Sequence, residues 1–398
     1  MTEPIEVHVD IDGSTVHAGT ARFASATRGG RQPSSFEYRA SYLTHPRAYA
    51  LDPGLPLATG VQFRSHGLFG SFGDSAPDRW GKRLIERAQS ERRFLSDADY
   101  LLAVDDGLRH GSIRFRDSRG WLATGGTVPR LVDLPELADR ARTVDVDPKA
   151  SVKLLLDVGS ATLGGARPKA TVSDGRHLWL AKFARVRDID EWNVIGLEKT
   201  ALDLAALCGI DVPARRLVGN TLLVKRFDRE QAQRIGYLSA MSVLEHGDGE
   251  TGDYLDLAMA IEEISAAPDA DLRELWLRAA FSVAIHNTDD HLQNHGFVRA
   301  RQGWRLSPVF DVNPNPVLGE ARATTIAAAD GPEREVAALE THAPEFRMST
   351  AEARAALRRI HDVLADWRSV AASNGVAASD ISVIEPAFTQ GRTLTEAR

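Results

Sequence analysis

The residues of this chain best suited to chemistry form one short run, His-Asn-Thr-Asp-Asp-His-Leu-Gln-Asn-His at 286–295. In it, Asn294 stands five residues after Asp289, and Asp311 follows further along the chain between a Phe and a Val. Carboxylate and amide oxygens suit Mg²⁺, a hard ion that prefers oxygen ligands. Phosphoryl transfer needs neutralised charge and an oriented nucleophile but little covalent chemistry from the protein. These residue types therefore favour metal-assisted phosphoryl transfer.

The order Asp, Asn, Asp is the one in which protein kinases arrange their catalytic groups. In those enzymes an Asp accepts the proton of the substrate hydroxyl, and an Asn five residues later holds a metal. A later Asp holds Mg²⁺ against the nucleotide phosphates. A solvated turn is a second interpretation, because Asn-Thr-Asp-Asp at 287–290 has local hydrogen-bonding turn chemistry.

A zinc site is the third interpretation of this run. His291 and His295 are four residues apart, and His286 is nearby, so two of the rings could share one face of a helix. However, Leu292 stands where the zinc-protease pattern HExxH needs its Glu, and Gly296 argues against a continuing helix. Neither the turn nor the zinc site accounts for the segments upstream.

Bulk properties limit the class of protein. At 398 residues the chain suggests two domains or one bilobal unit, and 43% hydrophobic with 26% charged residues is typical of a soluble globular protein. The net charge of −7 gives no general attraction to nucleic acid or anionic lipid. The single cysteine, Cys208, cannot form an internal disulfide. The N-terminus lacks a signal-peptide pattern, and no run reaches the roughly 20 apolar residues that span a bilayer. We expect a cytoplasmic protein without membrane contact.

The elements expected before residue 149 are mostly strands. Apolar residues alternate through 5–11, Asp12-Gly13 offers a hairpin turn, and the alternation resumes after the turn and again through 36–42. An apolar stripe predicts a helix at 78–88, and another strand is expected at 111–116. A polar stretch containing a proline precedes residue 149, and we place a domain boundary there.

The elements expected after this boundary are strands followed by helices. The predicted strands are 178–183, 217–227 and 304–310, and the predicted helices are 191–208, 272–285 and one tail helix at 351–371. Gly209 is the expected C-cap of the first helix. The strongly apolar helix 272–285 leads directly into the acidic run, so it is the element expected to position Asp289.

Three upstream segments could complete a nucleotide site. A glycine-rich loop, which lacks Walker A spacing, permits close approach to phosphate and has cations nearby; its residues are Gly164, Gly165, Ala166, Arg167, Pro168 and Lys169. Lys182 lies inside an otherwise apolar strand, where a kinase-like sheet places the Lys that pairs with nucleotide phosphates and a helix Glu. Glu198 in the following helix is the natural partner, although a Lys on a solvent face and a surface Glu are the plain alternatives.

The third segment, Lys-Arg-Phe-Asp-Arg at 225–229, ends a strand in the position of an interlobe hinge. Backbone groups near Lys225 could read the adenine edge of a nucleotide while Phe227 packs nearby. An ion pair between Arg226 and Asp228 is an equally good structural account of the same residues.

Five segments together resemble HipA-family toxin kinases, in the order found in that family and over about residues 5 to 320. They are Phe-Gly-Asp-Ser-Ala-Pro-Asp-Arg-Trp-Gly at 72–81, Gly-Gly-Ala-Arg-Pro-Lys-Ala at 164–170, Arg-Phe-Asp-Arg at 226–229, Asn-Thr-Asp-Asp-His at 287–291 and Leu-Ser-Pro-Val-Phe-Asp at 306–311.

The resemblance implies an α+β, bilobal, atypical protein-kinase-like fold. A β-rich N-terminal subdomain at 1–148 would precede the kinase domain at 149–398. That domain would divide into a nucleotide-binding part, about 149–228, and a mainly helical catalytic part, about 229–398. The resemblance also implies a Ser/Thr protein kinase held inactive by a small helix-turn-helix antitoxin, HipB-like, with DNA contacted mainly through that antitoxin.

The resemblance implies roles residue by residue. Asp289 would be the catalytic base, supported by His291, and Asn294 and Asp311 would be the Mg²⁺ ligands. Lys182 would contact the ATP phosphates, and the loop 164–169 would cover them.

Family members autophosphorylate at a Ser in that loop, whereas here the matching residue is Thr162, with Ser160 two residues earlier. Known targets include aminoacyl-tRNA synthetases, and nothing in the residues identifies the target of this chain. The alternatives are a small-molecule phosphotransferase using the same ATP site and a catalytically idle corepressor that binds the antitoxin.

Overall fold

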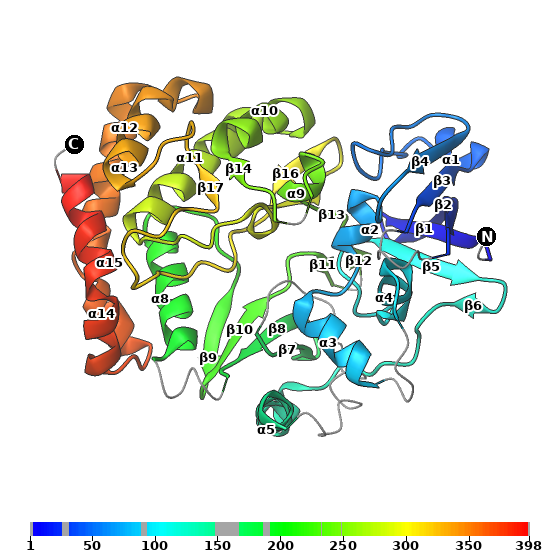
Figure 1. Ribbon diagram of the computed structural model, residues 1–398, viewed down its shortest axis with the longest axis horizontal. Helices are drawn as coiled ribbons and strands as arrows, with labels where there is room; N and C mark the ends of the chain where they lie inside the picture. Colours follow the sequence, from blue (N-terminus) through cyan, green and yellow to red (C-terminus); the bar gives the residue numbers. More distant parts are fainter. Residues whose placement is uncertain are drawn as a thin grey trace. The chain divides into compact units, whose positions relative to one another are not determined.

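The computed structural model describes residues 3–25, 32–88, 94–147, 167–185, 192–231, 233–247 and 249–396 (Figure 1). The chain divides into two compact units. The first unit comprises Met1–Val186 and Leu223–Leu238, and the second comprises Arg187–Leu222 and Ser239–Arg398. The domain boundary predicted next to residue 149 lies outside the described residues. Among those residues, no helix is long and apolar enough to cross a membrane.

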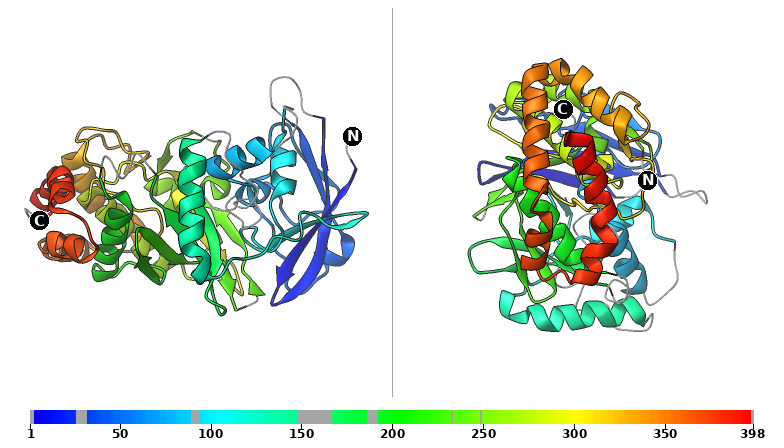
Figure 2. Two further views of the ribbon diagram at one scale, coloured as in Figure 1. Left: turned by 90° about the horizontal axis from the view of Figure 1, so that it is seen from below. Right: turned by 90° about the vertical axis from the view of Figure 1, so that its left-hand side faces the viewer.

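An antiparallel sheet of six strands in the order β4-β3-β2-β1-β5-β6 forms one layer of the first unit, and its twist is visible in Figure 2. The strands are β1 (Ile5–Ile11), β2 (Ser14–Phe23), β3 (Ser34–Tyr38), β4 (Val61–Arg64), β5 (Ile113–Asp117) and β6 (Gly120–Trp121). The predicted hairpin is confirmed, with Asp12 and Gly13 at positive φ in its turn. The strand predicted at 36–42 is wrong beyond Tyr38, because α1 (Ala40–Leu43) follows. Tyr42 is nevertheless buried, as the alternating apolar pattern predicted, but it lies in this helix and not in a strand.

Helices flank the strands of the first unit. They are α2 (Gly70–Asp74), α3 (Arg79–Ala88), α4 (Asp97–Ala103), the 3₁₀ turn η1 (Leu131–Asp133) and α5 (Leu134–Val146). Helix α3 confirms the helix predicted at 78–88, and Ser96 with Asp99 forms a capping box at the start of α4.

A second sheet in the first unit carries the lysines of interest. It contains β7 (Lys169–Ser173), β8 (Leu178–Phe183) and β10 (Thr221–Lys225), with β8 in the middle. Strand β8 confirms the prediction for 178–183. One face packs on α5, in a core made of Leu134, Leu137, Ala141, Ala170, Val172, Trp179, Ala181, Phe183 and Leu223. The chain then forms the short pair β11 (Arg229–Glu230) and β12 (Gln233–Arg234) and leaves this unit in β13 (Tyr237–Ser239).

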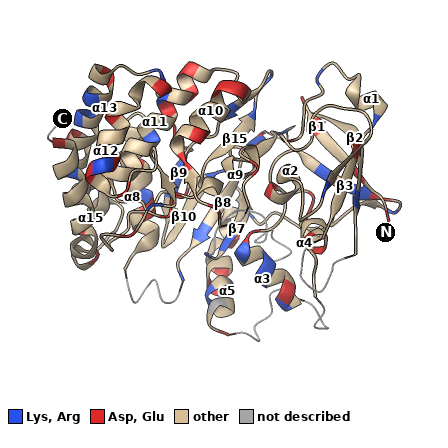
Figure 3. Cartoon of the chain, turned by 45° about the horizontal axis from the view of Figure 1, so that its top comes forward, with Lys and Arg blue, Asp and Glu red and all other residues tan. Residues whose placement is uncertain are grey.

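The second unit is mainly helical. Its helices are α8 (Val194–Leu207), α9 (Ala240–Val243), α10 (Tyr254–Ile264), α11 (Pro268–Ala284), α12 (Pro332–Thr341), α13 (Thr350–Leu364), α14 (Trp367–Ser373) and α15 (Ala378–Glu396), with 3₁₀ turns η2 (Leu292–Asn294) and η3 (Ala343–Phe346). Its strands are β9 (Arg215–Val218), β14 (Gly252–Asp253), β15 (Gly296–Arg299), β16 (Trp304–Leu306) and β17 (Thr324–Thr325). Acidic and basic residues are interspersed along these helices (Figure 3).

Local patterns predicted α8 and α11 well and the tail poorly. Gly209 follows α8 at φ +91°, as its predicted role at the helix end requires. The strand predicted at 304–310 ends at Leu306, two residues before Pro308, which lacks a backbone donor. The single tail helix is wrong: α13 and α14 are separate helices, and α12 and α15 were missed.

The C-terminal helix lies tightly against the helix that precedes the acidic run, as Figures 1 and 2 show. A Cβ atom placed on Gly391 of α15 would lie 1.7 Å from the carbonyl oxygen of Ala284, the last residue of α11. Only a residue without a side chain allows this approach. Helix α15 therefore packs against the last turn of α11, directly before the candidate catalytic loop.

Candidate active site

Helix α11 delivers the acidic run through a tight reversal of the chain. The amide of Ile285 donates to Phe281 at 3.0 Å, and His286 adopts a left-handed conformation, φ +54°. The amide of Asn287 then donates back to the carbonyl oxygen of Ser282 at 2.9 Å. These bonds end the helix and fix the direction in which the loop leaves it.

Asp290 is the buried anchor of this loop. Its carboxylate accepts hydrogen bonds from the hydroxyls of Tyr254 and Ser282, the latter at 2.8 Å, and it is 6% exposed. Nε2 of His295 lies 3.1 Å from its other oxygen, but off the line of a hydrogen bond, so this contact is electrostatic. Burial raises the pKa of Asp290, yet His295 and the two hydroxyls outweigh burial and hold that pKa below its usual value. Asp290 is therefore an ionised structural residue.

A guanidinium secures the same loop from a second side. Arg322 donates to the Ser282 hydroxyl at 3.1 Å and to the carbonyl oxygen of Asn287, and it forms a buried ion pair with Glu335 at 2.9 Å. Glu335 thus balances the charge of Arg322 within the unit. The guanidinium also satisfies the carbonyl oxygen of Asn287, which lies beyond the end of α11.

Asp289 differs from its neighbour in being exposed. The residues on either side of it, Thr288 and Asp290, are 6% exposed each, so the backbone around it is held while its own carboxylate reaches the surface. A carboxylate that solvent and a substrate can reach, on a backbone fixed from both sides, has the properties required of a general base.

Asn294 is oriented by the same loop. Its Nδ2 donates to the carbonyl oxygen of Asp289 at 2.9 Å, and its own amide donates to His291 at 2.8 Å. Because the nitrogen of the side-chain amide is used in this way, its oxygen points elsewhere, and oxygen is the atom that Mg²⁺ binds. The side chain fits the predicted role of a metal ligand.

Asp311 adopts a left-handed conformation, φ +57°, which a residue other than glycine adopts at a cost in backbone energy. Its carboxylate is partly exposed and accepts a hydrogen bond from Nδ2 of Asn313 at 3.3 Å. Strained backbone of this kind is common at functional positions. An ionised carboxylate here is a suitable oxygen ligand for a divalent ion.

The histidines of the run do not support the zinc interpretation. Nε2 of His286 lies 3.0 Å from the carbonyl oxygen of Val317, while His295 faces Asp290. Over the described ranges, the side chains close enough to share a metal are Glu6, His8 and His17 instead.

That second group is itself poorly prepared for a metal. Nδ1 of His17 faces the guanidinium of Arg39 at 2.9 Å, and its Nε2 faces the carbonyl oxygen of Gly19 at 3.0 Å. Both ring nitrogens of His17 therefore already have partners, and a metal would have to displace one of them.

The candidate phosphate-binding lysines lie in the first unit. Lys182 on β8 and Lys169 on β7 are 6% and 2% exposed, and Nζ of Lys169 lies 2.6 Å from a carboxylate oxygen of Asp78. Glu198, on α8 of the second unit, is 1% exposed, and a buried carboxylate needs a cationic or hydrogen-bonding partner. Its pairing with Lys182 stays a prediction. Residues Thr162, Ser160, Gly164, Gly165 and Ala166 lie outside the described residues.

The segment at 225–229 confirms the ion-pair interpretation. Asp228, buried, accepts two bonds from Arg226 at 2.9 and 2.7 Å and one from Arg229 at 2.7 Å. Burial raises the pKa of Asp228, but these two guanidinium groups outweigh it and keep that pKa well below the usual value. The arginines also donate to backbone carbonyls at 108–111, so the segment is a structural clasp within the first unit.

Two other residues of the same segment, Lys225 and Phe227, were predicted to lie beside the adenine of a nucleotide. Lys225 and Phe227 are both partly exposed, and the ring of Phe227 lies 6.1 Å from that of Tyr237, which stacks on His110 at 3.8 Å. Their contact with adenine remains a prediction.

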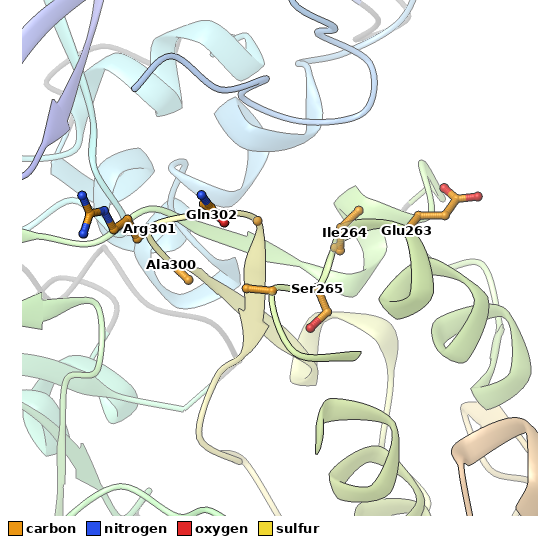
Figure 4. Close-up of a pocket in the computed structure, with 8 residues that line it drawn as sticks. Glu263, Ile264, Ser265, Ala300, Arg301 and Gln302 are labelled. Atoms are coloured by element: carbon orange, nitrogen blue, oxygen red, sulfur yellow. The ribbon is translucent and has the colours of Figure 1, made fainter. Parts of the chain in front are cut away.

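The second unit also holds an open pocket of about 710 Å³ (Figure 4). It is lined by residues 263–266 at the end of α10 and 300–303 between β15 and β16. None of the candidate site residues lines it. Gly303 is required there, since a Cβ atom would lie 2.7 Å from the carbonyl oxygen of Ile264.

Sequence reasoning missed the residues that support the site rather than those expected to do its chemistry. Asp290, Arg322 and Asp78 carry no distinguishing local pattern, because their burial and their partners depend on distant parts of the chain. The available signals for Asp78 and Asp290 were their places in the segments 72–81 and 287–291, which the resemblance had singled out.

Comparison with known proteins agrees with this architecture. Residues 161–367 match the family model described as the HipA-like C-terminal domain. HipA from Shewanella oneidensis, solved with HipB and operator DNA, is 14% identical, with a TM-score of 0.68 over 99% of this chain and 97% of that chain. This likeness shows the same overall fold and confirms the predicted fold class.

Two further structures resemble the chain weakly. The Helicobacter pylori proinflammatory kinase CtkA is 16% identical, with a TM-score of 0.36 over 58% of this chain and 94% of that chain. Choline kinase LicA from Streptococcus pneumoniae is 14% identical, with a TM-score of 0.22 over 59% and 92%. At these TM-scores neither likeness bears on the function. No curated protein sequence matches the chain.

Proposed function

Because the chain belongs to the HipA-like C-terminal domain family, we propose that it is an ATP- and Mg²⁺-dependent serine/threonine protein kinase. The observation that carries this proposal is the division of labour between adjacent aspartates. Asp290 is buried and fully engaged, whereas Asp289 is exposed on a backbone that its neighbours hold. Asn294, anchored on the carbonyl of Asp289, and Asp311 supply the oxygen ligands.

In the proposed reaction, each residue has one task. Asp289 orients the acceptor hydroxyl and takes its proton as the γ-phosphoryl group is transferred. Asn294 and Asp311 would hold Mg²⁺, which supplies charge neutralisation at the phosphates. Lys182 contributes a buried ammonium to the phosphates, and the loop 164–169 would cover them. Lys225 and Phe227 would lie beside the adenine ring of ATP.

We further propose that the kinase is the toxin of a two-component module. The Shewanella protein that shares its fold was solved with HipB and operator DNA, which supports a HipB-like antitoxin as the partner here. DNA would be met through that antitoxin, since the net charge of −7 gives no general attraction to a nucleic acid. The acceptor would be a translation component such as an aminoacyl-tRNA synthetase.

Phosphate transfer by purified protein to a bacterial lysate tests the proposal. Labelled Mg·ATP should give labelled protein with the wild type, and Asp289→Asn should lower the rate by about 10²–10⁴-fold, the usual contribution of a general base. ATP affinity should change little. Asp362→Asn, an exposed aspartate on α13 of the same unit, is the matched control and should keep the wild-type rate.

Two results would overturn this proposal. Wild-type protein that labels small metabolites and no protein would make it a small-molecule phosphotransferase. Protein that binds the antitoxin yet consumes no ATP under any condition would be a corepressor. Mass spectrometry of the incubated enzyme also tests autophosphorylation, for which Thr162 and then Ser160 are the expected acceptors.

A further inference from the structure

Strands β7 and β8 place two buried lysines directly opposite each other. Their antiparallel register pairs Lys169 with Lys182, and residues paired in this way project from the same face with Cβ atoms about 4.5–5.5 Å apart. The two side chains are 2% and 6% exposed. The two side chains therefore start side by side, and burying two ammonium groups on one face of a sheet requires compensating negative charge.

Asp78, distant in sequence, supplies part of that charge. One of its oxygens lies 2.6 Å from Nζ of Lys169, and the two side chains are 7% and 2% exposed. The other oxygen accepts a hydrogen bond from the amide of Gly81 at 2.7 Å, which satisfies an N–H group in the first turn of α3. Helix α3 lies beside this sheet in the first unit (Figure 1).

These contacts define the electrostatic surroundings of Lys169. Asp78 is fixed at the start of a helix, so its carboxylate cannot follow Lys169 elsewhere without losing the bond to Gly81. A buried carboxylate and a buried ammonium stabilise each other strongly, and separating them leaves both charges uncompensated. Asp78 therefore largely neutralises the charge of Lys169 within the first unit.

We propose that Asp78 is a positioning residue for the nucleotide: it retains Lys169 as its own ion-pair partner, so that Lys182 is the ammonium that the ATP phosphates meet. This inference rests on the proposed kinase function and revises one expectation from the sequence, in which Lys169 itself contacts ATP. It also gives the segment 72–81 a role, because that segment fixes the strand that directly follows the glycine-rich loop.

The test compares ATP affinity, measured calorimetrically with Mg²⁺ present, and kcat among charge variants of the full chain. Lys182→Met should weaken ATP binding by about 10–100-fold, the usual range for a lost hydrogen bond from a charged group. Lys169→Met should also weaken it, because the Asp78 carboxylate left behind repels the phosphates. The double variant Asp78→Asn with Lys169→Met removes both charges at nearly constant shape and should return ATP affinity to within about 3-fold of wild type.

The rescue separates positioning from direct contact. A double variant that binds ATP as poorly as Lys182→Met would show that Lys169 touches the phosphates and would overturn the inference, as would Lys182→Met with wild-type affinity. If the double variant does not fold, judged by circular dichroism, Asp78→Asn with Lys169→Gln takes its place.

The matched control is Asp52→Asn, a buried aspartate that accepts the amide of Ser71 at 2.8 Å on another part of the same unit. It should leave ATP affinity unchanged. Wild-type protein that neither binds ATP nor transfers phosphate refutes the proposed function itself. An active wild type with a failed rescue refutes the positioning role alone.

Discussion

Replacing Asp290 with alanine should lower the free energy of unfolding far more than a substitution at Asp289. In the folded protein the Asp290 carboxylate accepts hydrogen bonds from the Tyr254 and Ser282 hydroxyls and lies 3.1 Å from His295. All of these side chains are buried. The substitution thus removes one buried charge and leaves three buried polar groups without it.

The expected magnitude follows from these contacts. A buried donor that loses its acceptor costs about 1–3 kcal/mol, and this substitution removes the acceptor of two buried hydroxyls, those of Tyr254 and Ser282. Because the groups are neighbours their costs are not additive, so we expect Asp290→Ala to lower the free energy of unfolding by about 3–5 kcal/mol. That is a large share of the 5–15 kcal/mol typical of a folded protein.

Urea unfolding followed by circular dichroism, without nucleotide, measures this difference. Asp289→Asn is the internal comparison and should stay within about 0.5 kcal/mol of wild type, since it alters an exposed side chain. A loss below about 1 kcal/mol for Asp290→Ala would refute the anchoring role. Equal losses for the two variants would refute the assignment of separate tasks to the two aspartates.

Three further outcomes follow from the structure. Gly391→Ala must move α15 away from the Ala284 carbonyl oxygen, 1.7 Å from the new Cβ, and should lower the free energy of unfolding by about 1–3 kcal/mol, seen as a lower melting temperature. Burial lowers the pKa of His110 to about 4, below its ordinary 6.5, so the unfolded chain binds this proton more readily. Stability from this group is complete above pH 6.5 and is lost as pH falls toward 4, by about 1.4 kcal/mol per unit. His110→Phe, which keeps a ring on Tyr237, should flatten that part of the acid dependence in urea titrations at pH 7 and 4.5; an unchanged slope would contradict the assignment. Asp311→Ala should raise the Mg²⁺ concentration needed for half-maximal phosphate transfer at least about 10-fold, and an unchanged metal titration would count against its role as a ligand.

The elements that the sequence predicts well are those with a strong local period. Helix α11 and strand β8 show their apolar patterns within a few turns or residues, and the structure places them close to the expected positions. The tail fails for the converse reason. The break between α13 and α14 occurs around Asp366, without a proline or glycine to mark it, and α15 contains Pro386 in its interior. Such features depend on how helices pack and not on local preference.

The chemistry of the site was predictable only as far as residue types and spacing reach. The spacing singles out Asp289, Asn294 and Asp311, but it cannot say which of two adjacent aspartates is buried. The buried aspartate is the one whose carboxylate accepts hydrogen bonds from Tyr254 on α10 and Ser282 on α11. The buried clasp at 226–229 was foreseeable because its partners, Arg226 and Asp228, are two residues apart. Asp78 and Lys169 are 91 residues apart in the sequence, so no local pattern could predict that they pair.

These cases point to one physical distinction among the charged residues of the five family-like segments. Asp78, Asp228 and Asp290 are buried and each meets a cation or hydroxyl donors within its own unit, so their charges serve the fold. Asp289 and Asp311 are exposed or partly exposed on backbone that other bonds fix, which leaves a carboxylate able to meet a substrate or a metal. Burying a charge is costly unless it is paired, whereas a reacting carboxylate must remain accessible. A segment shared with a family therefore mixes residues that shape the site with residues that act in it. The environment of each carboxylate, more than its place in the segment, decides which of the two tasks we assign to it.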